Sequence, residues 1–132
     1  MATKDINTII KVSNAINATA IAADSDTDGE FIDTQGFYSL SFIAKSTAYT
    51  DGTYTLAIYE SDTASALDFT LAAADFVIGA GVISAVDTPV KIGYVGKKRY
   101  ARLRIIATGV TIGATLTADA IQGNPDDAPT AA

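Results

Sequence analysis

The feature that most constrains the fold of this chain is an alternation of apolar and polar residues with a period of two. In residues 38–42, large apolar side chains alternate with serines, and residues 53–60 continue the pattern. Successive side chains of a β-strand point to opposite faces, so this pattern predicts half-buried strands. The intervening Thr50-Asp51-Gly52 contains Asp-Gly, a strong hairpin signal. Residues 37–60 are therefore predicted to form a β-hairpin.

The alternation returns in the second half of the chain. A strand is predicted at 89–94, a turn at 95–98, a further strand at 99–107 and a last long strand or strand pair at 111–122. The strand at 99–107 is expected to turn Ala101, Leu103, Ile105 and Ala107 inward and Tyr100, Arg102 and Arg104 outward. Further strand candidates are residues 6–12, 15–23 and 67–71.

The number of strands indicates the fold class. No helix of three turns or more is predicted, and seven or eight short strands in a chain of 132 residues indicate one all-β domain. We expect a single-domain antiparallel β-sandwich, jelly-roll-like, with extended N- and C-terminal arms. The sandwich is assigned to residues 1–122, of which 1–14 form an N-terminal arm. Residues 123–132 are polar and contain proline, and are expected to be flexible or ordered by a partner.

Composition argues against most enzyme classes. The chain has no histidine and no cysteine, which removes the commonest general base, the usual metal ligand and any Ser-His-Asp or Cys-His arrangement. A net charge of −6 argues against nucleic-acid and anionic-membrane partners. There is neither a secretory signal nor a run of about 20 apolar residues. The sequence thus predicts a non-enzymatic protein, made in a cytoplasm, with no cofactor.

Residues 24–30 carry the sharpest local motif. Asp24, Asp26 and Asp28 precede a glycine and begin like an EF-hand loop, in which alternating carboxylates surround Ca²⁺. The closing glutamate of such a loop would fall at Gln35, and flanking helices are not predicted. We therefore expect a solvated acidic loop without metal, and these three aspartates are the candidate ligands if a cation binds.

A basic stretch lies further along the chain. Six of the nine Lys and Arg residues lie between Lys91 and Arg104. Tyr100, Arg102 and Arg104 would share the outer face of one strand, and Arg and Tyr are enriched at interface hot spots. This strand is a candidate interface, which the acidic loop of another copy could complement. The alternative is a solvated strand face whose charges prevent edge aggregation.

The stretch from Val90 to Leu103 resembles a pattern of small structural proteins encoded in the head-gene region of tailed bacteriophages. That pattern is an aliphatic strand, Gly-Tyr-x-Gly, two variable residues, Arg-Tyr-x-Arg and another strand, and it runs here from Gly93 to Arg102. Residues 50–62 and 33–37 are similar to the same group. Together these segments cover about half of the chain.

The resemblance implies a virion component, in particular a capsid decoration or cement protein. Such proteins sit on the outside of an icosahedral shell and clamp neighbouring capsid subunits, often as trimers. The implied partners are the phage major capsid protein and further copies of this chain, and the implied location is the capsid exterior. The interface residues expected for this role are Tyr100, Arg102, Arg104, Ile6, Ile9 and Ile10, the last three in an arm that docks on the shell.

Two other classes of function fit the same residues. One is a different virion part, such as a tail, head-closure or spike protein. The other is a carbohydrate- or Ca²⁺-binding β-sandwich module, which would use Asp24, Asp26 and Asp28 for the cation. Its exposed aromatic side chains would be Tyr38, Tyr49, Tyr59 and Tyr94. The absence of tryptophan weakens this second class.

Overall fold

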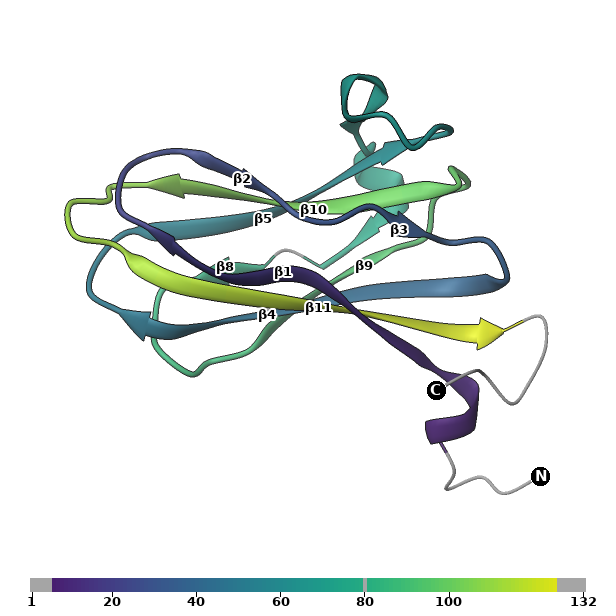
Figure 1. Cartoon of the computed structure of the whole chain (residues 1–132), viewed down its shortest axis with the longest axis horizontal. Helices are drawn as coiled ribbons and strands as arrows, with labels where there is room; N and C mark the ends of the chain where they lie inside the picture. Colours follow the sequence, from purple (N-terminus) through teal and green to yellow (C-terminus); the bar gives the residue numbers. More distant parts are fainter. Residues whose placement is uncertain (1–5, 80, 126–132) are drawn as a thin grey trace.

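Strands dominate the computed structural model, which describes residues 6–79 and 81–125. They form two antiparallel sheets that lie face to face (Figure 1), which confirms the predicted all-β sandwich. In chain order the elements are the 3₁₀ turn η1 (Asn7–Ile9), β1 (Lys11–Ile21), β2 (Asp26–Asp28), β3 (Ile32–Asp33), β4 (Phe37–Tyr49), β5 (Thr53–Ser61), η2 (Ala66–Asp68), β6 (Thr70–Leu71), η3 (Ala74–Phe76), β7 (Val77–Ile78), β8 (Val82–Ile83), β9 (Val90–Tyr94), β10 (Tyr100–Thr108) and β11 (Ala114–Pro125).

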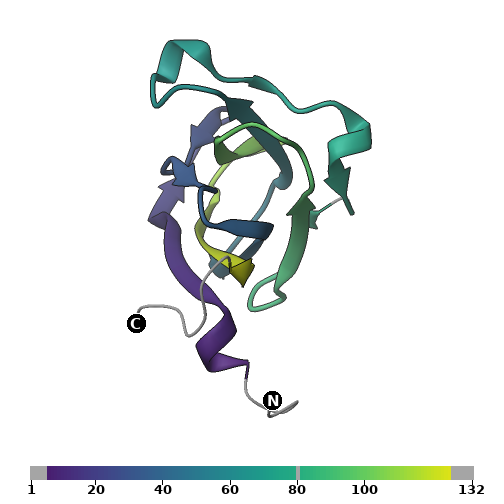
Figure 2. The ribbon, with the colours of Figure 1, turned by 90° about the vertical axis from the view of Figure 1, so that its right-hand side faces the viewer.

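The strand order is that of a jelly roll. One sheet has the order β1-β11-β4-β9-β7; the other has the order β2-β10-β5-β6, with β3 also paired to β10 and β8 to β5. From β4 onward the long strands β4, β5, β9, β10 and β11 alternate between the two sheets, which is the connectivity that two interlocked Greek keys produce. Figure 2 shows the resulting two layers from the end.

The predicted hairpin at residues 37–60 is wrong. β4 pairs with β11 and β9, whereas β5 pairs with β10, so the turn between β4 and β5 carries the chain from one sheet to the other. The same holds for β9 and β10 at residues 89–107. Alternation determines which face of a strand is buried, and that face is the same in a hairpin and in a crossing corner.

Asp51 explains why residues 50–52 form a corner. Its carboxylate accepts backbone N–H bonds from the β10–β11 loop, at 3.1 Å from Thr111, 3.0 Å from Ile112 and 2.9 Å from Gly113. The Tyr54 hydroxyl also donates to the Asp51 carbonyl at 2.8 Å. These N–H donors lower the pKa of Asp51. The Asp-Gly pair is thus bound to a loop sixty residues away, in place of closing a two-residue hairpin.

The core lies between the sheets and is built from the faces that alternation predicts. Tyr54, Leu56 and Ile58 of β5 are buried, as are the four predicted inward residues of β10. The even residues of β11 from Ala114 to Ala120 are buried as well. Tyr38 departs from the pattern at the start of β4, where it is 80% exposed.

The ends of the sandwich differ from the predicted boundaries. β1 begins at Lys11, which is paired with Gln122 of β11, so residues 11–14 belong to the sheet. β11 continues to Pro125, so the first residues of the predicted tail lie within a strand. Of the remaining arm residues, 6–10 contain η1, and 1–5 and 126–132 lie outside the described residues.

Residues 61–86 contain two single 3₁₀ turns and three two-residue strands. The strand predicted at 67–71 is present only as β6, because Ala66–Asp68 form η2. This part of the chain leaves the second sheet after β6 and crosses to β7, which pairs with β9 in the first sheet (Figure 2). It returns to the second sheet at β8, which pairs with β5. None of the described residues belongs to a helix that is long and apolar enough to cross a membrane.

Candidate interaction surface

The outer face of β10 was the predicted interface. In the structure, its arginines form ion pairs with aspartates of the same chain. Arg104 lies opposite Asp28 of β2, and its Nε and Nη2 donate to the two oxygens of that carboxylate at 2.6 and 3.2 Å. On its other side the guanidinium lies 4.1 Å from the ring centroid of Tyr59. Arg104 is therefore held from both sides and only partly exposed.

Arg102, which was also predicted to be an exposed interface residue, is only 6% exposed. Phe69 lies over its guanidinium with the ring centroid at 4.6 Å, and Phe31 lies at 5.7 Å. The two rings stack on each other at 4.7 Å. Asp28 is 3.4 Å from Nη2, and Nε has no hydrogen-bond partner. Arg102 is thus a packing element beneath the chain that follows β5, and a partner cannot reach it while that cover is in place.

The basic turn before β10 is paired in the same way. Arg99 forms a two-point ion pair with Asp33 at 3.0 and 2.9 Å and lies over the ring of Tyr100. This hydrogen bond lowers the pKa of Asp33. Lys98 binds Asp62 at 2.8 Å. Four of the six basic residues between Lys91 and Arg104 therefore pair with carboxylates of the same chain.

The aspartates of the acidic motif are engaged by groups of the same chain. Asp24 accepts the backbone N–H of Val110 at 2.8 Å, and Asp28 is engaged by two arginines. Asp26 lies 3.9 Å from Arg104. No group of three or more carboxylates that could hold a metal ion occurs within residues 6–79 and 81–125. Asp26 and Asp28 thus pair with arginines of the adjacent strand β10, and Asp24 binds the backbone after β10.

The four tyrosines considered for carbohydrate binding are dispersed. Tyr59 lies beneath Arg104, and Tyr49 packs edge-on against Tyr54 next to the core. Tyr94 is buried and donates a 2.6 Å hydrogen bond to Glu60, and its pKa is raised strongly, mainly by burial and then by that bond. Only Tyr38 is widely exposed, so these side chains do not form an aromatic platform.

The Gly-Tyr-x-Gly motif has a structural explanation at this corner. The Tyr94 hydroxyl accepts the backbone N–H of Lys98 at 3.2 Å, so the turn folds over the tyrosine ring. A Cβ at Gly96 would overlap that ring, which requires glycine there. The motif thus builds the crossing from β9 to β10. The sequence pattern could not distinguish this structural role from an interface.

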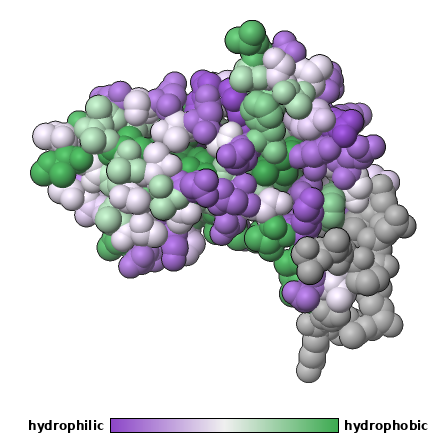
Figure 3. Space-filling model, viewed as in Figure 1, coloured by the Kyte–Doolittle hydropathy of each residue, from purple (hydrophilic) through white to green (hydrophobic). Residues whose placement is uncertain are grey.

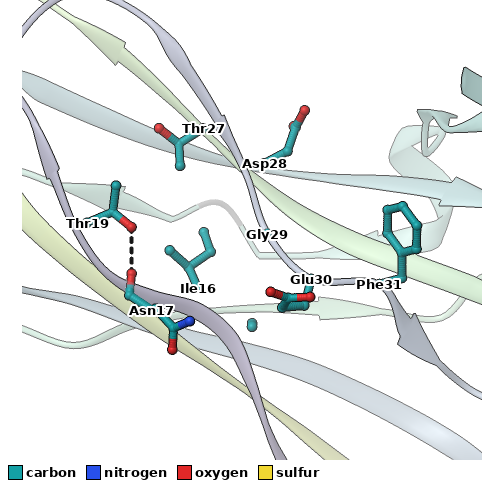
Figure 4. A pocket seen from close by; sticks show the side chains of 9 residues that line it. Ile16, Asn17, Thr19, Thr27, Asp28, Gly29, Glu30 and Phe31 are labelled. Atoms are coloured by element: carbon teal, nitrogen blue, oxygen red, sulfur yellow. Dashed lines mark hydrogen bonds between the residues drawn. The ribbon is translucent and has the colours of Figure 1, made fainter. Parts of the chain in front are cut away.

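A shallow pocket lies between β1 and β2, with a volume of about 250 Å³ (Figure 4). Its polar side chains include Asn17, Thr19, Thr27 and Glu30. The Thr19 hydroxyl donates to the backbone oxygen of Asn17 at 2.6 Å. Glu30 has no second acid or base beside it apart from Asp28, which its arginines neutralise. The pocket offers hydrogen bonds but no pair of groups for acid–base or nucleophilic chemistry.

Two exposed apolar regions were not predicted from sequence. The first is the η2 loop, defined here as residues 62–71, where Leu67 is 94% and Leu71 is 61% exposed. Its η2 turn projects beyond the second sheet (Figure 1), whereas its last two residues form β6 and pair with β5. Figure 3 shows apolar side chains at the tip of the loop. The alternation of Leu67, Phe69 and Leu71 indicated a strand, but Phe69 turns inward onto Arg102 while the leucines face solvent.

The second region is the Tyr38 groove on the outer face of the first sheet, with a volume of about 390 Å³. Its lining includes Tyr38, Leu40, Ile78, Gly93 and Val95. A smaller pocket of about 250 Å³ adjoins it, shares Tyr38 and Leu40, and adds Lys97 and Lys98. Small residues on β4 and β9 leave this face hollow, a feature that sequence alternation alone cannot reveal.

The N-terminal residues predicted to dock lie at the start of the described chain. Ile6 is 63% and Ile9 is 38% exposed, and Ile10 is partly buried. Ile6 and Ile9 flank or form η1, directly before β1. Their role in docking stays a prediction.

The sequence matches no protein-family profile and no curated protein. Among solved structures, the PBSX exported protein XepA is similar to this chain, with a TM-score of 0.61 and 17% identity over 92% of this chain. The chain spans 39% of XepA, and at this identity the likeness concerns the fold alone.

Two further structures are less similar. One is the disulfide-linked pilus of Bacillus endospore appendages, with a TM-score of 0.49 and 12% identity, covering 93% of this chain and 96% of the other. The second is PirA, with a TM-score of 0.40 and 13% identity, covering 93% of this chain and all 100% of PirA. At these scores neither likeness carries an argument.

Proposed function

We propose that this chain is a structural protein of a tailed-phage virion, and that it decorates and cements the capsid by binding the major capsid protein and its own copies. The observation that carries this proposal is the contrast between its two kinds of surface. Charged side chains on the outer face of β10 are paired within the chain, while large apolar side chains stand exposed on the η2 loop, in the Tyr38 groove and at η1. Exposed apolar patches of this kind mark protein–protein contacts.

The fold supports the same role. A jelly roll in which β4, β5, β9, β10 and β11 alternate between sheets resists opening, because neighbouring strands in space are distant in sequence. Asp51 ties two corners together, and Gln122 donates to the Asp33 carbonyl between the sheets at 2.9 Å. A rigid body with exposed apolar loops suits a protein that binds a capsid shell through many weak contacts. The likeness to an exported protein is compatible with a final location outside the cell.

We also propose that the chain has no enzymatic activity. Neither histidine nor cysteine is present in the sequence. The buried carboxylate of Glu60 is occupied by the Tyr94 hydroxyl and is closed to a substrate. The negative net charge further favours protein partners over nucleic acid.

Cosedimentation of the purified protein with undecorated phage heads tests the proposal. We expect saturable binding at a fixed ratio of this chain to capsid subunits. The double variant Ile6→Ser/Ile9→Ser should bind at least about tenfold more weakly, since each isoleucine contributes on the order of 1.5–3 kcal/mol when buried in a contact. The control Ile112→Ser removes an equally exposed isoleucine from the β10–β11 loop, far from η1 in Figure 1, and should bind like the wild type.

Wild-type protein that stays in the supernatant at every concentration would refute the decoration role. Binding that is unaffected by the double variant would leave the role standing and exclude η1 as the docking element.

A further inference from the structure

We propose that the η2 loop of one copy inserts Leu67 and Leu71 into the Tyr38 groove of a second copy. This contact rests on the proposed function, whose self-association it assigns to two specific surfaces. Leu67 and Leu71, called the knob below, and the Tyr38 groove lie on different elements of the same chain. Each copy therefore carries one knob and one groove.

The knob is apolar and protrudes. Leu67, at 94%, is the most exposed large apolar side chain among those described, and Leu71 beside it is 61% exposed. Phe69, between them in sequence, is anchored on Arg102 and Phe31, which holds the base of the loop in place. Hydrogen bonds also preorganise the tip, because the Thr63 hydroxyl donates to Asp68 at 2.6 Å. A preorganised apolar tip loses little conformational entropy on insertion.

The groove has the size and lining to receive it. A cavity of about 150 Å³ accommodates benzene, so a groove of about 390 Å³ has room for two leucine side chains. Its exposed apolar lining is formed by Tyr38, Ile78 and Val95, and it includes Gly93, where no side chain stands in the way. Ile78 and Val95 are 62% and 50% exposed, so a bound knob would cover both.

The charges of the η2 loop and of the groove are complementary. The η2 loop contains Asp62 and Asp68 and no basic residue, whereas Lys91 lines the groove and Lys97 lines the adjoining pocket. Within residues 6–79 and 81–125, neither lysine has an ion pair, while Asp62 is already bound to Lys98. Asp68, next to Leu67 at the tip, is therefore the carboxylate that would meet these two lysines across the contact.

The geometry also excludes insertion into the same chain. The loop emerges from β5 and β6 in the second sheet, and the groove lies on the outer face of the first. Figure 2 shows the tip of the loop and the β7–β9 edge on different sides of the molecule. Because knob and groove are different patches, the contact is heterologous, and repetition generates a closed ring or an open filament. The trimer implied by the sequence resemblance is one such ring.

Complementation between two variants tests the contact. Leu67→Asp removes the knob, and Gly93→Leu fills the groove; a Cβ at position 93 meets its nearest atoms at 3.7 and 3.8 Å, so the substitution fits the folded chain. Light scattering and sedimentation velocity should show that wild-type protein self-associates and that each variant does so at least about tenfold more weakly. An equimolar mixture of the two variants should form a one-to-one heterodimer, because one intact knob meets one intact groove.

The control Ile112→Asp replaces an exposed apolar side chain on the β10–β11 loop and should self-associate like the wild type. Circular dichroism checks the fold of every variant, and Ile78→Asp replaces Gly93→Leu if the latter fails to fold. A wild-type protein that is monomeric throughout the micromolar range would overturn the proposal, as would a mixture of variants that stays monomeric.

The same variants separate this contact from the decoration role. Wild-type protein that saturates phage heads as independent monomers would overturn the knob-and-groove contact and leave the decoration role intact. Complementing variants without any binding to heads would support the contact and refute decoration.

Discussion

Substitutions at Arg102 test whether its charge or its packing matters. Arg102→Met keeps an unbranched side chain between Phe31 and Phe69 but removes the guanidinium. The losses are two cation–π contacts, each worth on the order of 0.5–2 kcal/mol, and a long 3.4 Å contact with Asp28. Asp28 keeps its 2.6 Å hydrogen bond to Arg104, so no uncompensated charge remains.

A gain opposes these losses. The buried Nε of Arg102 has no hydrogen-bond partner among the described residues, and an unsatisfied buried donor costs about 1–3 kcal/mol. The two contributions are of similar size, so the free energy of unfolding of Arg102→Met should lie within about 1 kcal/mol of the wild type. Arg102→Ala also loses the packed stem, and should be less stable than Arg102→Met by about 2–5 kcal/mol.

Urea denaturation at neutral pH measures both differences, with the slope of the transition checking that the two-state description holds. If Arg102→Met costs as much as Arg102→Ala, the charge itself stabilises the fold and the reasoning is refuted. Binding of Arg102→Met to phage heads should equal that of the wild type, since Arg102 is covered by Phe69.

Two further predictions concern pH and backbone conformation. Arg99 lowers the pKa of Asp33 below its ordinary value of 3.8, so this pair stabilises the folded state above pH about 4 and the contribution is lost as pH falls through the lowered pKa. Asp33→Asn should therefore reduce the melting temperature at neutral pH and make its decline in acid shallower; an unchanged acid profile would contradict this. Gly113→Ala places a Cβ against the Ile21 carbonyl at a φ of +112°, whereas Gly36→Ala, at a φ of +89°, meets nothing within 4 Å. Gly36→Ala should cost only backbone strain of about 1–2 kcal/mol, and Gly113→Ala at least twice as much in urea denaturation; equal costs would show that the chain relaxes freely at Gly113.

The predicted site residues show where sequence reasoning is limited. Arg102 and Arg104 were correctly assigned to the outer face of their strand. A side chain on that face can nevertheless be shielded from solvent by other parts of the chain. Asp28, which accepts a 2.6 Å hydrogen bond from Arg104, lies 76 residues earlier in the chain. Phe69, which covers Arg102, also belongs to a distant part of the sequence. No local pattern around residue 102 reports on such a cover.

What the sequence determined by itself is the all-β content and the buried faces of β5, β10 and β11. Alternation is a local property, since the pleat forces neighbouring side chains to opposite faces whatever the strand pairs with. The core residues of β5, β10 and β11 follow from it directly.

Tertiary structure alone decided the strand partners, the corners and the surfaces left open. The Asp-Gly turn at 51–52 suits a hairpin in isolation, but three N–H groups from residues 111–113 bind Asp51 and make it a corner. Those donors reach Asp51 only after β5, β10 and β11 have packed. Strand pairing depends on such long-range contacts, which is why β4 and β5 lie in opposite sheets and do not form the expected hairpin within the predicted sandwich.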